Sequence, residues 1–430
     1  MNSIAAELNG TLEGTVADSL LSDLGRRMYF PKGIISQSAE AKKLAHRIDA
    51  TIGIATEKGE PLYLKTIREA LTGLTPKETF PYAPTAGIPP LREEWKKEII
   101  KKNPSLAGKG MSLPVVVTGL THAIAVVLDL FANPRDTLIV PDFFWDNYEL
   151  IASDRLQAEV AGFPFFTPAG KLNVEGLADA LRARRGGKAV IMLNFPNNPT
   201  GYTLTESEAE RLVKAIRNEA EHNTRILVVC DDAYFGLFFE EGLKTESLFA
   251  DLADLHPNVL AVKTDAATKE ELVWGFRVGF VTYGSKGLDE KHYEALIQKT
   301  MGLIRSSISC SGTPSQYLVL KGLMDERHEV EKAATFKTVE TRYRRVKELV
   351  RWMRGPLKPF PFNSGYFMTF RVPGDRAEDL RQALLKRGIG TIAIRPDCLR
   401  IAYSSVDAEK LDELFGCIDD EAVKLFGQGK

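Results

Sequence analysis

The sequence has few cysteines, and no run of apolar residues in it is long enough to cross a membrane. Its cysteines are Cys230, Cys310, Cys398 and Cys417, and none lies within a few residues of another. The closely spaced ligands of a zinc site are therefore missing, and we expect no metal. The first residues also lack the positive and apolar regions of a signal peptide, so we expect a reduced, cytoplasmic protein.

Neither sign of charge dominates. The 430 residues include 56 lysines and arginines and 57 aspartates and glutamates, which gives a formal net charge of -1. Nothing in that balance favours a nucleic acid or a membrane surface as a partner. A G-x-G-x-x-G or Walker loop is missing after the first apolar run, which argues against a nucleotide-binding α/β protein.

Seven short apolar runs predict buried strands, because several are rich in Val and Ile and are bounded by Gly, Pro, Asn or Asp. The runs are Val115–Val117, Thr137–Val140, Glu159–Phe163, Ala189–Asn194, Ile226–Asp231, Val259–Lys263 and Val278–Tyr283. Helical patterns separate most of them, as over Glu206–Glu221 after the N-cap candidate Thr205. The alternation predicts an α/β fold with a mostly parallel seven-stranded sheet flanked by helices.

One link breaks this alternation. The last two runs are separated by a polar loop with little room for a crossover helix, so we expect the Val278 strand to run antiparallel. A long helix over 325–354 and a break at Gly355-Pro356 mark a domain edge. We predict an N-terminal segment, 1–55, that packs with the small domain, a large domain, 56–325, and a smaller α+β domain, 326–430.

Polar side chains follow several of these strands, at the edge of an open α/β sheet where ligands bind. They include the run from Asn194 to Gly201, the sequence Asp231-Asp232-Ala233-Tyr234 and the pair Thr268-Lys269. Each run alone has a plainer interpretation: a turn, a capping carboxylate or a solvated lysine. Arg400, inside a late apolar strand, is by itself equally typical of an edge-strand charge or a structural ion pair.

Together these runs resemble the class I/II aminotransferase family, which binds pyridoxal 5'-phosphate (PLP) in fold type I. The shared pattern comprises Asn-Pro-Thr-Gly, Asp-x-Ala-Tyr, a lysine followed eight residues later by Arg277, and Arg-Ile-x-Tyr-Ser from Arg400. The likeness extends from about Asp49 to Ser405. The resemblance implies a Schiff base on Lys269, since PLP chemistry needs a lysine amine. It also implies Asp231 at the pyridine nitrogen, where a negative charge keeps the ring protonated. Asp232 is the alternative, although its side chain should point to the other face of the strand.

The resemblance assigns further residues to the cofactor. Asn198 and Tyr234 match those that donate to its 3-oxygen, and we count Tyr234 with Lys269 and Asp231 as catalytic. The residues matched to the phosphate are Gly119, Leu120 and Thr121 at a helix start, together with Arg277. Trp145 resembles the aromatic residue that stacks on the ring. Tyr82 resembles the tyrosine that reaches the neighbouring subunit's phosphate, which implies a homodimer with shared active sites.

Substrate residues follow from the same likeness. Arg400 matches the arginine that binds the α-carboxylate in a bidentate pair, and Asn198 and Gly53 are assigned beside it. Arg305 lies where relatives specific for dicarboxylates carry an arginine across the dimer, or it is simply an exposed helix arginine. The sequence departs from the family at Ala266, where many members have a hydroxyl on the phosphate. Lys263 is a second candidate for the Schiff base, although it lacks the downstream arginine.

The activity implied is transfer of an amino group from an L-amino acid to a 2-oxo acid, with Lys269 as the general base that moves the α-proton. Two alternatives remain on the same scaffold. A PLP-dependent carbon–sulfur β-lyase would share Lys269, Asp231 and Arg400. A non-catalytic PLP-binding regulator would usually add a DNA-binding module, for which residues 1–50 are too short and too little basic.

Overall fold

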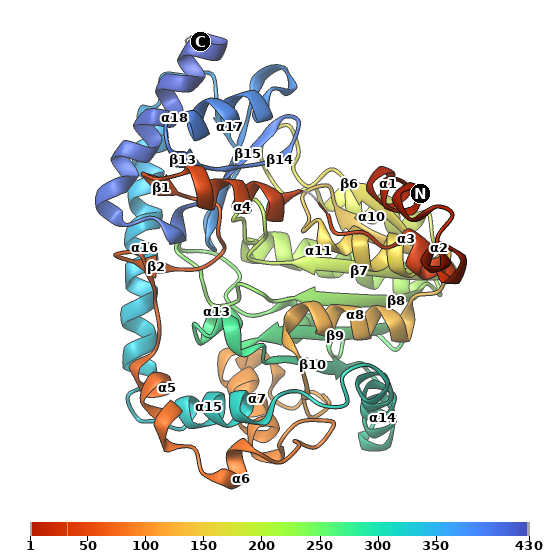
Figure 1. The fold of residues 1–430 in the computed structure, drawn as a ribbon. Helices are drawn as coiled ribbons and strands as arrows, with labels where there is room; N and C mark the ends of the chain where they lie inside the picture. The colour runs from red at the N-terminus through yellow and green to blue at the C-terminus, as the bar shows by residue number, and fades with distance from the viewer. Residues whose placement is uncertain (1, 32, 428–430) are drawn as a thin grey trace.

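A central sheet of seven strands organises the large domain in the computed structural model, which describes residues 2–31 and 33–427 (Figure 1). Its strand order is β4-β10-β9-β8-β7-β5-β6. The strands are β4 (Val115–Val117), β5 (Thr137–Pro141), β6 (Glu159–Phe163), β7 (Lys188–Asn194), β8 (Arg225–Asp231), β9 (Val259–Ala266) and β10 (Gly279–Gly284). All seven predicted strands are therefore confirmed, with β9 three residues longer than its apolar core.

The direction of the last strand is also confirmed. Strands β5, β6, β7, β8 and β9 pair in parallel, whereas β10 pairs antiparallel with both β9 and β4. The connection between β9 and β10 holds only the four-residue helix α13 (Ala267–Glu270) and a short 3-10 turn. A link this short returns the chain beside the strand that it has just left.

Alternate residues of the strands fill two separate cores, one on each face of the sheet. Met192 and Val229 face the core under α8 (Gly119–Phe131) and α14 (Glu290–Ser307). Ile191 and Val228 face the other core. The helices on that face are α7 (Pro89–Lys102), α10 (Val174–Arg182), α11 (Glu206–Glu221), α12 (Leu248–Leu252) and α15 (Thr313–Leu323). The N-cap predicted at Thr205 forms a capping box with Glu208.

The small domain is a four-stranded antiparallel sheet with order β11-β12-β15-β14. Its strands are β11 (Lys358–Pro359), β12 (Phe367–Arg371), β14 (Ile392–Arg395) and β15 (Cys398–Ala402). Helices α17 (Ala377–Lys386) and α18 (Leu411–Phe426) cover it. Two 3-10 turns precede the final helix, which begins at Leu411.

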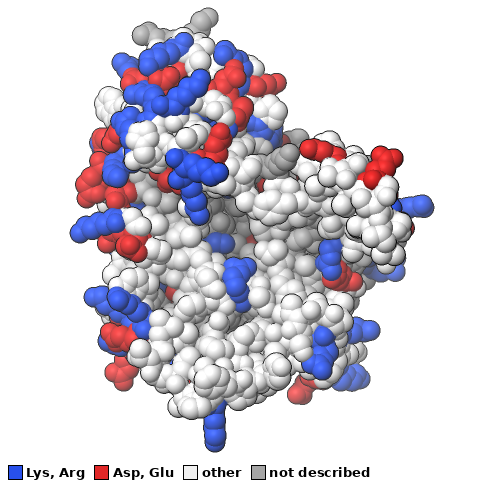
Figure 2. Space-filling model, viewed as in Figure 1, with Lys and Arg blue, Asp and Glu red and all other residues white. Residues whose placement is uncertain are grey.

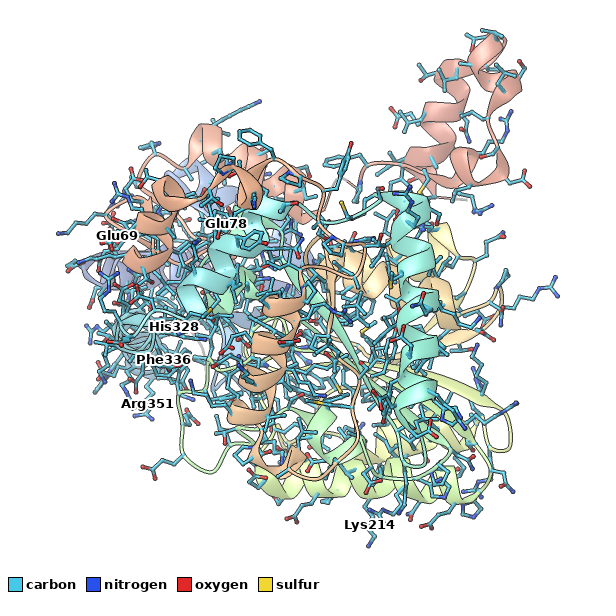
Figure 3. The ribbon with its side chains drawn as sticks, turned by 90° about the horizontal axis from the view of Figure 1, so that it is seen from below. Glu69, Glu78, Lys214, His328, Phe336 and Arg351 are labelled. Carbon is cyan, nitrogen blue, oxygen red and sulfur yellow. The ribbon has the colours of Figure 1, made fainter. Side chains whose placement is uncertain are left out.

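Helix α16 (His328–Trp352) runs along the left side of the molecule in Figure 1 and joins the two domains. Figure 3 labels His328, Phe336 and Arg351 along it, and shows Lys214 of α11 pointing into solvent elsewhere. Just before its first turn, Arg327 pairs with Glu69 of α5 (Lys65–Ala70) at 2.9 Å. The helix therefore starts on the large domain and ends against α18.

The N-terminal segment contacts both domains. Helix α4 (Ile34–Leu44) packs on α17 and β14, and β1 (Ile48–Asp49) pairs in parallel with β13 (Ile389–Gly390). By contrast, Arg27 donates to the carbonyl of Asp154 in the large domain at 2.9 Å. Arg27 is the last residue of α3 (Asp23–Arg27), which follows α1 (Ser3–Leu12) and α2 (Val16–Leu20). These three helices lie at the far right of Figure 1. Helix α4 and β1 thus contact 377–395, whereas α3 contacts Asp154 near the central sheet.

Two searches of the described residues gave no candidates. No helix within 2–31 and 33–427 is long and apolar enough to span a membrane. The same residues contain no group of three or more His, Cys, Asp or Glu side chains placed to hold a metal ion.

Candidate active site

A cavity of about 260 Å³ lies at the carboxyl ends of β7, β8 and β9, beside the start of α8. Most of the residues predicted for the cofactor line it, although they come from distant parts of the chain. They are Leu120, Thr121, Trp145, Asn198, Asp231, Tyr234, Lys269 and Arg277, with Gly53 from the N-terminal segment. This is the edge at which open α/β sheets bind ligands.

Lys269 lies in α13, and its Nζ is 4.6 Å from the centre of the Tyr234 ring. Burial lowers the pKa of Lys269 to about 8, with Arg277 acting in the same direction and Asp231 opposing it. At pH 7 roughly a tenth of this amine is therefore unprotonated, far more than for an exposed lysine, and carbonyl addition and proton abstraction both require that form.

Asp231 ends β8 with its side chain in the cavity and is 2% exposed. Burial raises the pKa of Asp231 to about 6, although the Tyr148 hydroxyl and the Ala233 amide both donate hydrogen bonds to its carboxylate. A buried carboxylate without a cation in direct contact is costly to maintain. It is well suited to a protonated ring nitrogen that supplies the missing charge.

The neighbouring carboxylate faces the other side of the sheet, as strand geometry predicts. Asp232 forms an ion pair with Lys263, and Lys263 Nζ also lies 3.5 Å from Asp265. Although burial alone would lower it, these carboxylates raise the pKa of the Lys263 ammonium. Lys263 is thus held as a charged partner outside the cavity, and this argues against its candidacy for the Schiff base.

An anion cradle forms where Arg277 crosses the start of α8. Gly119 has φ +78°, and a Cβ built there would lie 2.3 Å from Arg277 Nη2. No side chain caps α8, so the amides of its first turn are free for a ligand. Arg277 has no ion-pair partner among residues 2–31 and 33–427, and its Nη1 donates only to the Trp274 carbonyl. Amides and a guanidinium together suit a phosphate.

Arg400 lies on β15 and is 3% exposed. Its Nη1 donates to Asn198 Oδ1 at 3.2 Å, and its Nη2 donates to the carbonyl of Thr51 at 3.0 Å. Its Nε has no hydrogen-bond partner, and no described carboxylate pairs with it. Burial lowers the pKa of Arg400. A buried guanidinium without a counter-ion is the feature expected of a carboxylate-binding residue.

Two predicted residues lie away from this cavity. Tyr82 is 92% exposed and does not reach the cavity of its own chain. Arg305, at the end of α14, is also exposed and donates to Ser309. Both residues were expected to act in the active site of the partner subunit, and their positions within one chain do not test that expectation.

Three residues of the site had no role assigned from the sequence, although Asn194 and Thr268 belong to the polar runs noted there. Tyr148 donates to Asp231, and Asn194 both donates to the Asp231 carbonyl and accepts from the Asn198 amide. The hydroxyl of Thr268 is buried beside the cavity without a partner. Because Ala266 occupies the usual hydroxyl position, Thr268 is the hydroxyl that this chain offers instead. Its place directly before Lys269 was the available signal.

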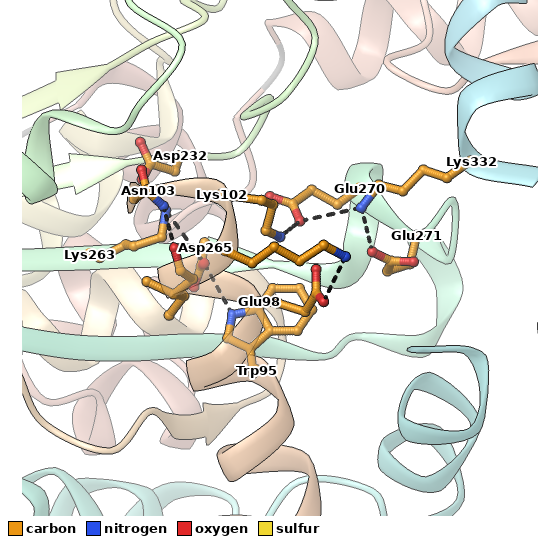
Figure 4. A network of polar contacts seen from close by, with 12 residues as sticks. Trp95, Glu98, Lys102, Asn103, Asp232, Lys263, Asp265, Glu270, Glu271 and Lys332 are labelled. Carbon is orange, nitrogen blue, oxygen red and sulfur yellow. Dashed lines mark hydrogen bonds and ion pairs between the residues drawn. The ribbon is translucent and has the colours of Figure 1, made fainter. Parts of the chain in front are cut away.

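The acidic residues after Lys269 fix α13 to neighbouring helices (Figure 4). Glu271 is fully buried and accepts from His328 at 2.5 Å and from Lys332 at 2.8 Å. Although burial alone would raise it, Lys332 and then His328 hold the pKa of Glu271 well below its usual range. Glu270 pairs with Lys102 of α7 at 2.5 Å. The unusual Glu-Glu sequence therefore anchors the lysine-bearing helix to α16 and α7.

Comparisons with known proteins identify the family. The family model for aminotransferase class I and II matches residues 55–418, so the chain belongs to this family. Aspartate aminotransferase from Thermotoga maritima is 24% identical over 395 residues, covering 89% of this chain and 94% of that enzyme. Aspartate aminotransferase from Bacillus sp. strain YM-2 is 25% identical over 315 residues, covering 70% and 72% of the two chains.

Solved structures share the fold. An aminotransferase from Anaerococcus prevotii superposes with a TM-score of 0.81 at 21% identity, covering 92% of this chain and 98% of that one. Aspartate aminotransferase from Thermus thermophilus with maleate gives a TM-score of 0.72 at 19% identity, covering 93% and 99%. The protein is a PLP-dependent aminotransferase of fold type I. The site offers a lysine amine, a buried carboxylate and an anion cradle at Gly119, and these groups fit PLP.

Proposed function

We propose that the aminotransferase reaction takes place in the cavity around Lys269, with Asp231 and Tyr234 as its other catalytic residues. The observation that carries the proposal is the amine of Lys269, whose pKa is about 8, in one cavity with the buried carboxylate of Asp231. PLP, when bound, supplies an aldehyde for the lysine and a ring that accepts electrons from the substrate's α-carbon.

The phosphate of the cofactor would be held by the amides of Gly119, Leu120 and Thr121 and by the Arg277 guanidinium, with the Thr268 hydroxyl nearby. Asp231 would hold the proton on the ring nitrogen, supported by the hydrogen bond from Tyr148. The donors for the ring oxygen would be Asn198 and Tyr234, while Trp145 would cover the ring face.

Arg400 would bind the α-carboxylate of the amino acid, and Asn198 and Gly53 would complete this part of the site. Once the substrate amine has replaced it, Lys269 Nζ takes the α-proton as general base and later returns it. The released 2-oxo acid leaves the amino group on the enzyme, and a second 2-oxo acid accepts it by the reverse steps.

The proposal includes a homodimer in which Tyr82 of each subunit reaches the partner's phosphate site. Its support is the 92% exposure of Tyr82, next to the equally unpacked Phe80 at 82%. Arg305 would face the partner's substrate only if the substrate carried a second carboxylate. A cytoplasmic location stays a prediction from the sequence.

The test compares the wild type with Lys269→Ala and with Lys263→Ala. With PLP and an amino acid but no 2-oxo acid, the wild type should convert the cofactor and release one equivalent of 2-oxo acid. Lys269→Ala should release none. Release by Lys269→Ala, with loss in a folded Lys263→Ala variant, would move the reaction to the other lysine. Continuous release of ammonia with pyruvate from cystathionine would instead indicate the β-lyase.

A further inference from the structure

The cofactor cavity opens into a second, larger cavity of about 680 Å³. The two share Gly53, Thr121, Trp145, Asn198 and Tyr234 in their walls. Arg400 lines only the larger one. A substrate whose α-carboxylate binds Arg400 therefore has its side chain in this larger space.

The wall beyond Arg400 is mainly apolar, and it comes largely from the N-terminal segment. Its apolar side chains include Ile34, Ile35, Ile52, Ile54, Leu150 and Phe367. Figure 2 shows a hollowed centre on one face of the molecule, with fewer charged side chains there than at the top of the view. An apolar wall favours a phenyl or long alkyl group, whereas an unpaired carboxylate placed there loses its hydration without compensation.

The charges of the cavity also disfavour a second carboxylate. Besides Arg400, the lining residues that the structure describes include one cation, Lys42, and two carboxylates, Asp146 and Glu149. Neither carboxylate has an ion-pair partner within residues 2–31 and 33–427, and Lys42 is exposed on α4. Once Arg400 is neutralised by the α-carboxylate, the other described lining residues carry more negative than positive charge.

We infer that this enzyme acts on amino acids with a large, uncharged apolar side chain, and that it discriminates against aspartate and glutamate. The inference rests on the proposed role of Arg400 and Lys269. Such a specificity differs from that of the two relatives described above, which are aspartate aminotransferases. The wall of Ile34, Ile35, Ile52 and Leu150 determines the specificity, because it replaces a distal cation by apolar surface.

Binding of unreactive carboxylic acids tests this without turnover. Calorimetry on the PLP-loaded protein should give 3-phenylpropanoate at least about tenfold tighter binding than succinate, a difference of roughly 1.4 kcal/mol. Succinate binding as tightly as 3-phenylpropanoate, or binding by neither acid, would overturn the inference. An affinity for succinate that is lost in Lys42→Ala would also overturn it, because Lys42 would then be a distal carboxylate site.

A pair of matched variants adds the missing cation and controls for it. Ile35 is 52% exposed and lines the cavity, whereas Ile100 is 39% exposed on α7 and lines neither cavity. Ile35→Arg should tighten succinate binding about tenfold and Ile100→Arg should leave it unchanged. Equal effects of the two substitutions would contradict a specificity role for this wall.

The cofactor spectrum separates this inference from the proposed function. Phenylalanine should convert the bound cofactor and aspartate should not. If aspartate converts it faster, the proposed function stands and the inference fails. If no amino acid converts it but 3-phenylpropanoate still binds preferentially, the reaction assigned to Lys269 fails and the apolar character of the cavity stands.

Discussion

Replacing Asp231 by Asn should stabilise the cofactor-free protein while removing its activity. Burial raises the pKa of Asp231 from 3.8 to about 6. The difference is about 2.2, and at about 1.4 kcal/mol for each pH unit the ionised carboxylate costs roughly 3 kcal/mol. Asn keeps the shape and can hydrogen-bond to Tyr148, but it carries no charge to desolvate.

The pH dependence follows from the sign of this shift. Because the folded chain holds the proton more tightly than the unfolded chain, the cost is full above about pH 6. It shrinks as the pH falls toward 3.8, where Asp231 is protonated in the folded chain and increasingly so in the unfolded one. The advantage of Asp231→Asn should therefore be large at pH 8, about half as large at pH 5 and small at pH 4.

The neighbouring residue provides a control with the opposite sign. Asp232→Asn removes the closer of the two carboxylates that pair with Lys263, which is 1% exposed, and should cost at most about 3–5 kcal/mol because Asp265 still lies 3.5 Å from the Lys263 Nζ. Urea denaturation of both cofactor-free variants at the three pH values is the assay. A loss of stability in Asp231→Asn at pH 8, or a gain that does not change with pH, would refute the reasoning. PLP should stabilise the wild type more than Asp231→Asn, because its ring proton pairs with the carboxylate.

Three further predictions concern the surroundings of the cofactor. Arg277→Gln should weaken PLP binding about tenfold or more, because the cradle at Gly119 loses its guanidinium. Fluorescence titration measures this, and an unchanged affinity would contradict the cradle. Glu271→Gln should lower the free energy of unfolding by about 3–5 kcal/mol, because His328 and Lys332 lose a buried partner. Urea denaturation checks this, with Glu329→Gln as the control at an exposed position. Tyr82→Ala and Lys269→Ala should each be inactive alone but regain activity when mixed, because one subunit of the mixed dimer supplies the tyrosine and the other supplies the lysine. Continued inactivity of the mixture, with exchange of subunits verified, would exclude a shared site.

Much of the fold could be predicted from the sequence, because buried strands require apolar runs and strand geometry fixes alternation. The opposite orientation of Asp231 and Asp232 follows from that alternation alone. The antiparallel course of β10 followed from the length of one loop. In each case the signal was local, within a single run or a single connection.

Contacts between distant segments could not be predicted in the same way. The hydrogen bond from Tyr148 to Asp231 depends on how the short helix Asn147–Glu149 packs, and no spacing in the sequence records it. The pairing of Glu271 with Lys332 joins residues that are 61 positions apart. The contact of Arg27 with Asp154 likewise comes from tertiary packing of a short helix, which local propensity does not specify.

The most direct test of the account is the visible absorption spectrum of the wild type and Lys269→Ala, each mixed with PLP and then with phenylalanine. We predict that the wild type shows the absorption band of lysine-bound cofactor, and that phenylalanine converts it to the aminated form with release of phenylpyruvate. Lys269→Ala should show neither the band nor the release. The band and the release in Lys269→Ala, or their absence in the wild type, would contradict the assignment of Lys269.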